Sequence, residues 1–380
     1  MFWKRNPIVL ALIATVIGLN LVVACSPAAS PETVDQGQMP ESAETAPVLE
    51  QQDPEPDVSW PSPRIHPTMF YDPVAKHIVM FSGMSRMQRN VDLNEVWTYD
   101  SARGSWEQIG EMEPKDSLIS LGFDEASRQI VTLNNQPRQT WSYDLEKGAW
   151  QQRNPSEKPS ENPPLGQRFG AGMTYDSESD RLVLFGGGAP GKLYADTWAY
   201  DYDTDTWEEM HPANQPSPRA MYHLVYDSES DRVILWGGFM EPGVEDVQIW
   251  AYDYNSDVWE ALENLDGPQQ HWERGGAVYI PEMDRILFFT GMREYEDVLV
   301  GPEIWYYDYN TNSWTLIDTA DSPPQLAMYA MVYDPSIRKV VLFGGEGTSK
   351  YTGNITSDVW LFDPQEENWS QVAGPARGQE

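Results

Sequence analysis

The chain has a single cysteine, Cys25, among its 380 residues, so no intramolecular disulfide can hold its fold. Positive charge is also scarce, with 25 lysine and arginine residues against 59 aspartate and glutamate residues and a formal net charge of −34. A surface this acidic repels phosphate groups, which argues against nucleic acid as a partner. The five histidines lack clustered spacing, and no phosphate-binding loop, dinucleotide fingerprint or nucleophile elbow is present. The sequence therefore predicts no metal and no cofactor.

The first residues of the chain are typical of an exported protein. Lys4 and Arg5 precede an apolar run over residues 8–23, and Val22-Val23-Ala24-Cys25 resembles the lipobox of bacterial lipoproteins. We expect residues 1–24 to be a signal peptide and Cys25 to be lipidated, which would anchor the chain outside the cytoplasmic membrane. The alternative is an ordinary secretory signal with a stray thiol. Residues 25–56 are rich in Ser, Pro, Ala, Glu and Gln, which predicts a disordered tether.

The rest of the chain is an internal repeat. Six tryptophans each begin a Trp-x-aromatic-Asp element: Trp97, Trp141, Trp198, Trp250, Trp305 and Trp360. A second tryptophan follows nine residues after each of them: Trp106, Trp150, Trp207, Trp259, Trp314 and Trp369. Upstream of each element lies an apolar run, starting at Ile78, Ile130, Leu182, Val233, Ile286 and Val340. A period near fifty residues with such a pattern is the signature of stacked repeats.

Each unit is expected to form four short strands, here called a to d from first to last. The apolar run is strand b, and its continuous hydrophobicity predicts burial on both faces, as in blades stacked around an axis. The paired tryptophans mark strands c and d, and runs such as DSESDR are typical of the turns between strands. The repeat resembles kelch-type β-propellers, such as the central domain of galactose oxidase. We predict an all-β, six-bladed propeller of four-stranded antiparallel blades over residues 57–373, followed by a C-terminal tail, 374–380.

The lengths of the connections predict which face of the propeller binds. The a–b and c–d spacings are the same in all six units, whereas the b–c and d–a connections vary in length. In an up-and-down blade these two kinds of connection lie on opposite faces. Variable loops on a regular scaffold usually carry binding, so the loop face is the expected binding face.

Arginines recur at the start of the innermost strand, at Arg64, Arg168 and Arg219, and Trp272 takes the same register in the fifth unit, with Arg274 two residues beyond it. In kelch domains such arginines often point into the central mouth, so the resemblance implies an anion or carboxylate contact. Pairing with neighbouring loop carboxylates is the alternative. The b–c loops add the remaining candidate ligand-binding residues: Arg86, Phe239 and Met292.

Three classes of function fit this sequence. We favour a noncatalytic module that recognises a glycan or a protein. An enzyme is the second class, and one similar to sialic-acid mutarotases would need no metal, whereas copper radical chemistry needs a cysteine that Cys25 cannot supply. A structural scaffold in an envelope complex is the third. No catalytic residue is predicted, because fold alone cannot choose among these classes.

Overall fold

The structure is a computed structural model. It describes residues 60–85, 91–113, 120–133, 139–155, 168–244, 246–263, 266–268, 275–290, 293–295, 298–300, 303–319, 322–324, 326–347, 354–372 and 374. The described residues form β-strands, turns and irregular connections, and no helix occurs among them. None of the described residues belongs to a helix of the length and apolar character that crossing a membrane requires.

Six four-stranded antiparallel sheets, the blades, follow one another along the chain. Blade 1 contains β1 (Thr68–Asp72), β2 (His77–Phe81), β5 (Glu95–Asp100) and β6 (Ser105–Glu111). Blade 2 contains β7 (Ser120–Asp124), β8 (Gln129–Leu133), β9 (Thr140–Asp144) and β10 (Ala149–Arg153). Blade 3 contains β11 (Gly172–Asp176), β12 (Arg181–Phe185), β15 (Thr197–Asp201) and β16 (Thr206–Met210).

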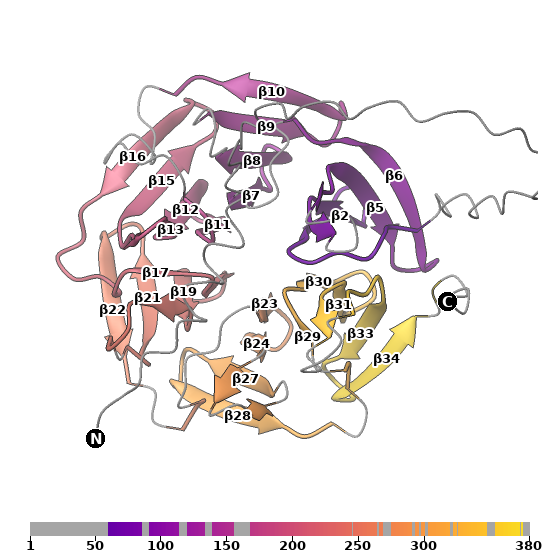
Figure 1. Cartoon of the computed structure of the whole chain (residues 1–380). Coiled ribbons are helices and arrows are strands. Elements are labelled where there is room, and N and C mark those ends of the chain that lie inside the picture. The colour runs from indigo at the N-terminus through magenta and orange to yellow at the C-terminus, as the bar shows by residue number, and fades with distance from the viewer. Residues whose placement is uncertain are drawn as a thin grey trace, which may run out of the picture. The chain divides into compact units, whose positions relative to one another are not determined.

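The second half of the ring repeats the same order. Blade 4 contains β18 (His223–Asp227), β19 (Arg232–Trp236), β21 (Ile249–Asp253) and β22 (Val258–Leu262). Blade 5 contains β23 (Gly276–Ile280), β24 (Arg285–Phe289), β27 (Ile304–Asp308) and β28 (Ser313–Ile317). Blade 6 contains β30 (Ala330–Asp334), β31 (Lys339–Phe343), β33 (Val359–Asp363) and β34 (Asn368–Val372). The first strand of each blade lies near the centre and the last at the rim (Figure 1). The predicted six-bladed propeller is confirmed.

The hydrophobic core lies between neighbouring blades. Strand b supplies its largest share, and in β31 the four residues from Val340 to Phe343 are fully buried. One cluster joins Met80 and Trp97 of blade 1 to Val341 and Phe343 of blade 6, and the other large clusters are shared between neighbours in the same way. Each blade therefore buries its apolar faces only by stacking, which explains the continuous apolar runs in the sequence.

The turns between strands are built from aspartates, as the turn chemistry predicted. Asp176 ends strand a of blade 3, and its Oδ1 accepts hydrogen bonds from the amides of Glu178 (3.1 Å) and Ser179 (3.0 Å). Asp201 does the same in the c–d turn, where it accepts from the Thr204 amide at 3.0 Å. A side chain that binds the amides of its own turn favours one turn length. Blade 5 keeps the same a–b spacing with Ile280 in place of the aspartate.

A second turn residue holds the strand-c tyrosine in some blades. Tyr200 donates its hydroxyl to Asp205 at 2.7 Å, Tyr252 to Asp257 at 2.9 Å and Tyr307 to Asn312 at 3.0 Å. Each acceptor lies five residues after its tyrosine and has a left-handed backbone, with φ between 47° and 53°. In blades 1 and 2 this left-handed position is a glycine, Gly104 or Gly148, which cannot accept.

Tryptophans of strand d link neighbouring blades where strand c begins with threonine. The indole of Trp207 donates to Thr140 Oγ1 at 3.0 Å, and that of Trp259 donates to Thr197 Oγ1 at 2.9 Å. Blades 4 and 5 carry isoleucine at the threonine position, at Ile249 and Ile304. The indole N–H groups of the next strand-d tryptophans, Trp314 and Trp369, then have no partner among the described residues.

The ring closes without a displaced strand, because each blade is one continuous segment of the chain. The segment before β1 binds blade 6: Trp60 Nε1 donates to Ser357 O at 2.9 Å, and Arg64 N donates to Thr356 O at 3.3 Å. Gly374, beyond β34, lies against the Trp60 ring, since a Cβ added there would be 3.5 Å from Cζ2. Residues 57–59 lie outside the described residues, and Trp60 is in no strand.

Candidate functional site

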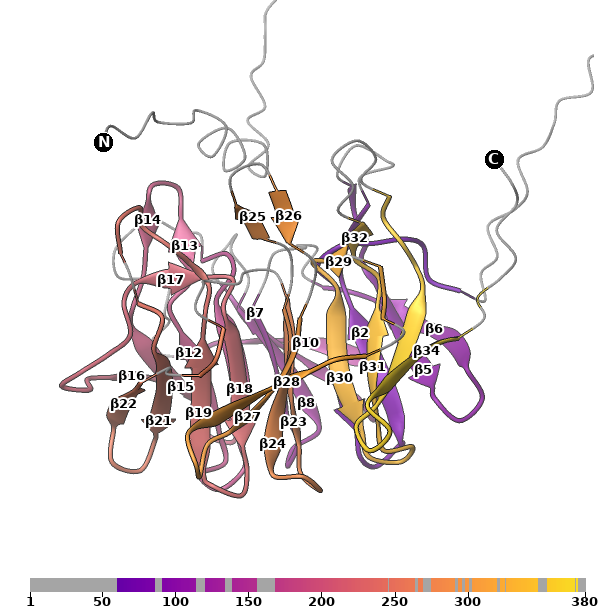
Figure 2. The ribbon, with the colours of Figure 1, turned by 90° about the horizontal axis from the view of Figure 1, so that it is seen from below.

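The two faces of the propeller differ in construction. Tight a–b and c–d turns form one face, called the turn face (Figure 2). Within the described residues, the opposite face, called the loop face, carries five small two-stranded sheets: β3 (Met84–Ser85) with β4 (Val91–Asp92), β13 (Gly188–Ala189) with β14 (Lys192–Leu193), β17 (Arg219–Ala220) with β20 (Phe239–Met240), β25 (Arg293–Tyr295) with β26 (Val298–Val300), and β29 (Leu326–Ala327) with β32 (Glu346–Gly347). The predicted division into a uniform face and an individual face is present in the structure.

Half of the predicted binding residues lie in the described part of the chain. Arg64, Arg168 and Arg219 stand just before the innermost strands of blades 1, 3 and 4, and Phe239 is half-buried in β20. The other residues named from the sequence lie outside the described residues: Arg86, Trp272, Arg274, Met292 and the lipidation candidate Cys25. Predictions for those five residues therefore stay predictions.

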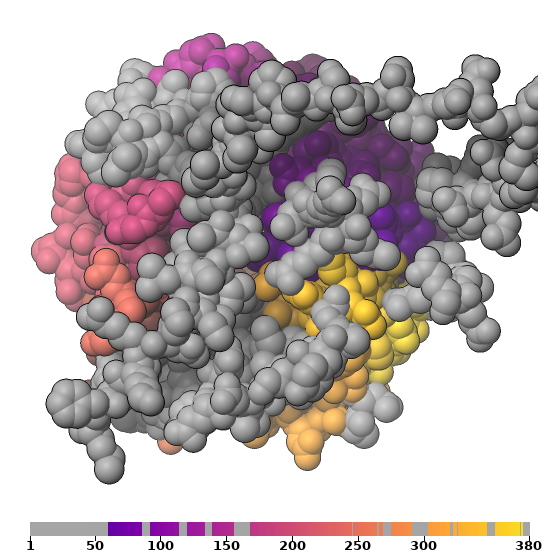
Figure 3. Space-filling model, viewed as in Figure 1, coloured from indigo at the N-terminus to yellow at the C-terminus, as the bar shows by residue number. Residues whose placement is uncertain are grey.

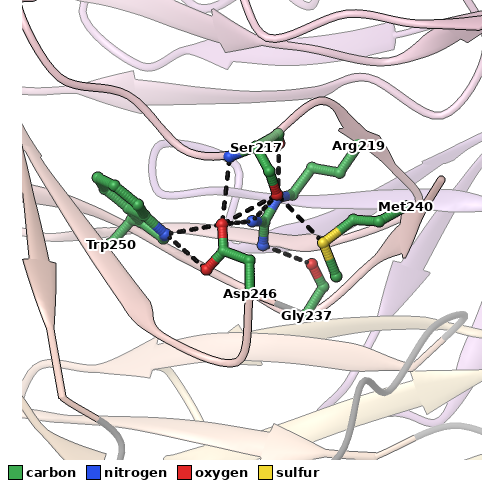
Figure 4. Close-up of polar contacts among 6 residues, drawn as sticks. All are labelled: Ser217, Arg219, Gly237, Met240, Asp246 and Trp250. Atoms are coloured by element: carbon green, nitrogen blue, oxygen red, sulfur yellow. Dashed lines mark hydrogen bonds and ion pairs between the residues drawn. The ribbon is translucent and has the colours of Figure 1, made fainter. Parts of the chain in front are cut away.

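Arg219 is the centre of a polar network beneath the loop face (Figure 4). Its guanidinium donates to the Gly237 carbonyl and to the Ser217 carbonyl, both at 3.0 Å, and forms an ion pair with Asp246. Asp246 also accepts from Trp250 Nε1 at 3.0 Å and from the Ser217 amide at 3.2 Å. The network joins the segment before strand a, the end of strand b and the loop before strand c.

Arg168 and Arg64 repeat this arrangement in blades 3 and 1. Arg168 donates to the Gly186 carbonyl at 2.6 Å and binds both carboxylate oxygens of Asp196 at 2.7 Å. Arg64 donates to the Ser82 carbonyl at 3.1 Å and forms a longer ion pair of 3.4 Å with Glu95. In all three blades the accepting carbonyl lies 18 residues after the arginine. The arginines thus form one recurring latch between the loops of a single blade.

Burial makes these latches part of the scaffold. The side chains of Arg64, Arg168 and Arg219 are 0%, 3% and 0% exposed. Burial lowers the pKa of Arg64 to about 10 against the opposing effect of Glu95, and it also lowers the pKa of Arg219. Burial alone would raise the pKa of Asp246, but the Arg219 charge and hydrogen bonds outweigh it and hold that pKa below its usual value. Leaving one member of such a pair buried alone costs roughly 3–5 kcal/mol.

The pairing with loop carboxylates is therefore confirmed for all three arginines. A direct ligand contact by their guanidinium groups stays a prediction, and it would require a ligand to replace these internal partners. Blade 2 has neither member of the pair. Asp116 takes the arginine register there, and Gln139 takes the carboxylate position, where it accepts from Trp141 Nε1 at 3.3 Å. Blades 5 and 6 keep a carboxylate at this position, Glu303 and Asp358, although no arginine takes the register there, so the sequence pattern alone did not reveal the pairing.

A ring of residues, here called the mouth ring, lies two positions after the arginine register: His66, Gly170, Met221 and Met328 in the described blades. Neighbours in this ring bind each other through the backbone, with His66 N donating to Met328 O at 2.7 Å and Met221 N donating to Gly170 O at 2.8 Å. All four have left-handed backbones, with φ of 54°, 63°, 57° and 61°. Sequence reasoning missed this ring, because only Gly170 is of a type that favours such a backbone.

His223 is a buried titratable group away from the latches. It begins β18, is 5% exposed and stacks on Trp236 with ring centroids 5.8 Å apart and planes at 14°. Its Nε2 has no hydrogen-bond partner among the described residues, and burial lowers its pKa to about 4. Within the same part of the chain, no three histidine, cysteine, aspartate or glutamate side chains are grouped so that they could hold a metal ion.

Comparison with known proteins agrees with the architecture. The chain is 23% identical over 202 residues to Mei4-dependent protein 6 of Schizosaccharomyces pombe, which covers 48% of this chain and 29% of that protein. It is 24% identical over 224 residues to multiple epidermal growth factor-like domains protein 8 of Mus musculus, covering 56% of this chain and 8% of that protein. It is 26% identical over 214 residues to F-box/kelch-repeat protein At1g51550 of Arabidopsis thaliana, covering 51% of this chain and 42% of that protein.

The chain thus spans less than half the length of each of these relatives. The KLHDC2/KLHL20/DRC7 Kelch-repeats domain family matches residues 115–325 and 213–379, which together cover most of the six blades. The chain therefore belongs to the KLHDC2/KLHL20/DRC7 Kelch-repeats domain family.

Proposed function

We propose that this chain is a noncatalytic protein-interaction module that binds its partner through the loop face. The observation that carries the proposal is the difference between the two faces. Equal a–b and c–d spacings make the turn face uniform. On the loop face, the hairpins β3/β4, β13/β14 and β25/β26 lie in the b–c connections of blades 1, 3 and 5, whereas β20 and β32 of blades 4 and 6 pair with β17 and β29, which precede strand a. Kelch propellers generally bind protein partners, which makes a protein the favoured ligand over a glycan.

The proposal extends to the position of the module in the cell. The lipobox-like sequence ending at Cys25 supports a lipid anchor, and the polar segment 25–56 supports a tether. A propeller held in this way would stand outside the cytoplasmic membrane with its loops free to meet a partner. The latches support binding through the loop face, because buried ion pairs fix the loops of blades 1, 3 and 4 before any partner arrives.

Photo-crosslinking from the two faces tests the proposal. Val244 on the loop face is 37% exposed, and Val74 on the turn face is 64% exposed, so the two valines form a matched pair. A photoreactive benzoylphenylalanine at each position, in the full-length chain in its own cells, should give a discrete protein adduct from position 244 and none from position 74. Adducts from position 74 alone would refute loop-face binding. Saturable binding to a glycan array with no protein adduct would replace the protein partner by a sugar.

A further inference from the structure

Blade 5 keeps one half of the latch that blades 1, 3 and 4 complete. In a complete latch, a guanidinium binds both a carboxylate from the loop before strand c and the carbonyl just after strand b (Figure 4). Blade 5 has Glu303 at the carboxylate position, whereas Trp272, which carries no charge, takes the arginine register. Thr290 follows Trp272 by the same 18 residues that separate each latch arginine from its accepting carbonyl.

The backbone and a tryptophan hold Glu303 in the way that they hold the latch carboxylate of blade 3. In blade 3, Asp196 O accepts from the amide just after strand b at 3.0 Å, and its carboxylate accepts from Trp198 Nε1 at 2.9 Å. In blade 5, Glu303 O accepts from Thr290 N at 2.9 Å, and its Oε2 accepts from Trp305 Nε1 at 2.8 Å. The acceptor groups of the two blades therefore have equivalent positions.

The cation is what blade 5 lacks. Glu303 is half-buried, and its Oε1 has no hydrogen bond or ion pair within the part of the chain that the structure describes. The tryptophan does not need a charge at this position, because Gln139 accepts from Trp141 Nε1 in blade 2 through a neutral amide. A partly buried carboxylate without a counter-charge is costly, so its charge needs another role. Asp358, the equivalent carboxylate of blade 6, has a further interaction, so this argument concerns blade 5 alone.

The three complete latches indicate which group fits the open one. Each of them holds a guanidinium, and Arg168 binds both carboxylate oxygens of Asp196 at 2.7 Å. The planar fork of donors in a guanidinium matches a carboxylate, whereas an ammonium offers only a compact point charge. The net charge of −34 also attracts a cationic partner. An arginine side chain is therefore the expected occupant.

We propose that Glu303 and the Thr290 carbonyl form an open latch that receives an arginine side chain of a protein partner. This inference rests on the proposed function, since it names the place and the chemistry of one contact on the loop face. The partner supplies the guanidinium that Arg64, Arg168 and Arg219 supply within their own blades. Glu303 is then a specificity-determining residue, because a partner with a neutral side chain at this point leaves its charge unpaired.

The probe is a phage-displayed library of linear dodecapeptides, panned in high salt against the full-length chain in detergent micelles. High salt screens exposed charges far more than a partly buried pair. The selected peptides should share an arginine. Replacing it with citrulline, which keeps the shape without the charge, should lower the affinity at least tenfold. Glu303→Gln should lower the affinity to the same degree, and the arginine and citrulline peptides should then bind this variant equally.

Two controls accompany this experiment. Glu229→Gln removes the same charge from an exposed residue of the turn face, so it should leave the affinity unchanged. The melting temperature of Glu303→Gln should stay within about 2 °C of wild type, because glutamine already serves as the acceptor at this position in blade 2.

Each other outcome overturns the proposal. A fall of more than about 4 °C in the melting temperature of Glu303→Gln would show that Glu303 pairs with a cation of its own chain, for which Arg274 is the candidate. An equal loss of affinity in Glu229→Gln would show general electrostatic attraction instead of a latch. Peptides without a shared arginine, or a library that yields no binder, would refute the arginine contact. The crosslink from position 244 could still form in each case, so failure of this inference is distinguishable from failure of the proposed function.

Discussion

Replacing Gly148 with asparagine should stabilise the propeller. Gly148 has a φ of 63° and takes the left-handed position of the c–d turn in blade 2. The hydroxyl of Tyr143, which is 1% exposed, has no hydrogen-bond partner in the described part of the chain. A Cβ at position 148 would meet only this hydroxyl, at 3.6 Å. Blade 5 already has the proposed arrangement, with Asn312 left-handed and accepting from Tyr307 at 3.0 Å.

Three contributions set the size of the effect. A new hydrogen bond to a buried hydroxyl adds about 0.5–1.5 kcal/mol, and replacing glycine reduces the entropy of the unfolded chain by a further 0.4–1 kcal/mol, roughly. The left-handed backbone removes part of this gain, although asparagine tolerates it better than other side chains. We therefore expect a net gain of about 1 kcal/mol in the free energy of unfolding, which is roughly 2 °C in melting temperature for a domain of this size.

Urea denaturation of wild type, Gly148→Asn and Gly148→Ala measures the effect. Alanine adds the same Cβ without an acceptor, so it should destabilise by about 1 kcal/mol through strain alone. Tyr143→Phe should remove the advantage of asparagine, because the hydroxyl that donates is gone. If asparagine and alanine had the same effect, or if the gain survived in the Tyr143→Phe background, the hydrogen-bond argument would be wrong.

Three further predictions follow from buried polar groups and from the sequence of the N-terminal segment. Thr197→Val keeps the shape of the side chain but removes the acceptor of the buried Trp259 indole, so it should cost about 1–3 kcal/mol in urea denaturation; no measurable cost would contradict the role of this bond. The pKa of His223 is lowered from 6.5 to about 4, so the unfolded chain takes up a proton first as the pH falls, and stability is lost below about pH 6.5. Wild type should therefore lose roughly 3 kcal/mol relative to His223→Phe between pH 7.5 and pH 4, and a constant difference would refute this. Cys25→Ser should abolish acylation and release the chain from membranes in a fractionation assay, and a variant retained there would exclude lipid anchoring through this residue.

Much of the fold could be predicted because the same residue types recur at the same strand positions in successive blades. Trp198 lies in β15 and Trp207 in β16, as their spacing indicated, and the apolar run at Leu182 forms β12. Large apolar and aromatic residues at these positions can be buried only between stacked blades, so the residue type predicts the strand in which each lies. Aspartates at the ends of strand c in all six blades, and of strand a in every blade but the fifth, where Ile280 stands, likewise mark the turns in the sequence.

The site was harder to predict, because its residues fit more than one environment. An arginine before an innermost strand can point into the mouth or beneath it, and the partner of Arg219, Asp246, comes 27 residues later in a loop of variable length. No sequence pattern predicted the mouth ring. A methionine in a left-handed conformation looks like any other methionine in sequence, and only the left-handed backbone that His66, Met221 and Met328 share shows that their positions are equivalent.

The adjacency of Trp60 and Gly374 has a consequence for how this propeller can be built into other proteins. Because each blade is a continuous segment and the two ends of the ring meet at one point, the circle has no preferred beginning. A circular permutant that links residue 374 to residue 60 and opens the chain between β16 and β17 would keep every sheet whole. Because its two ends lie side by side, the domain could also be inserted into a single surface loop of a host protein.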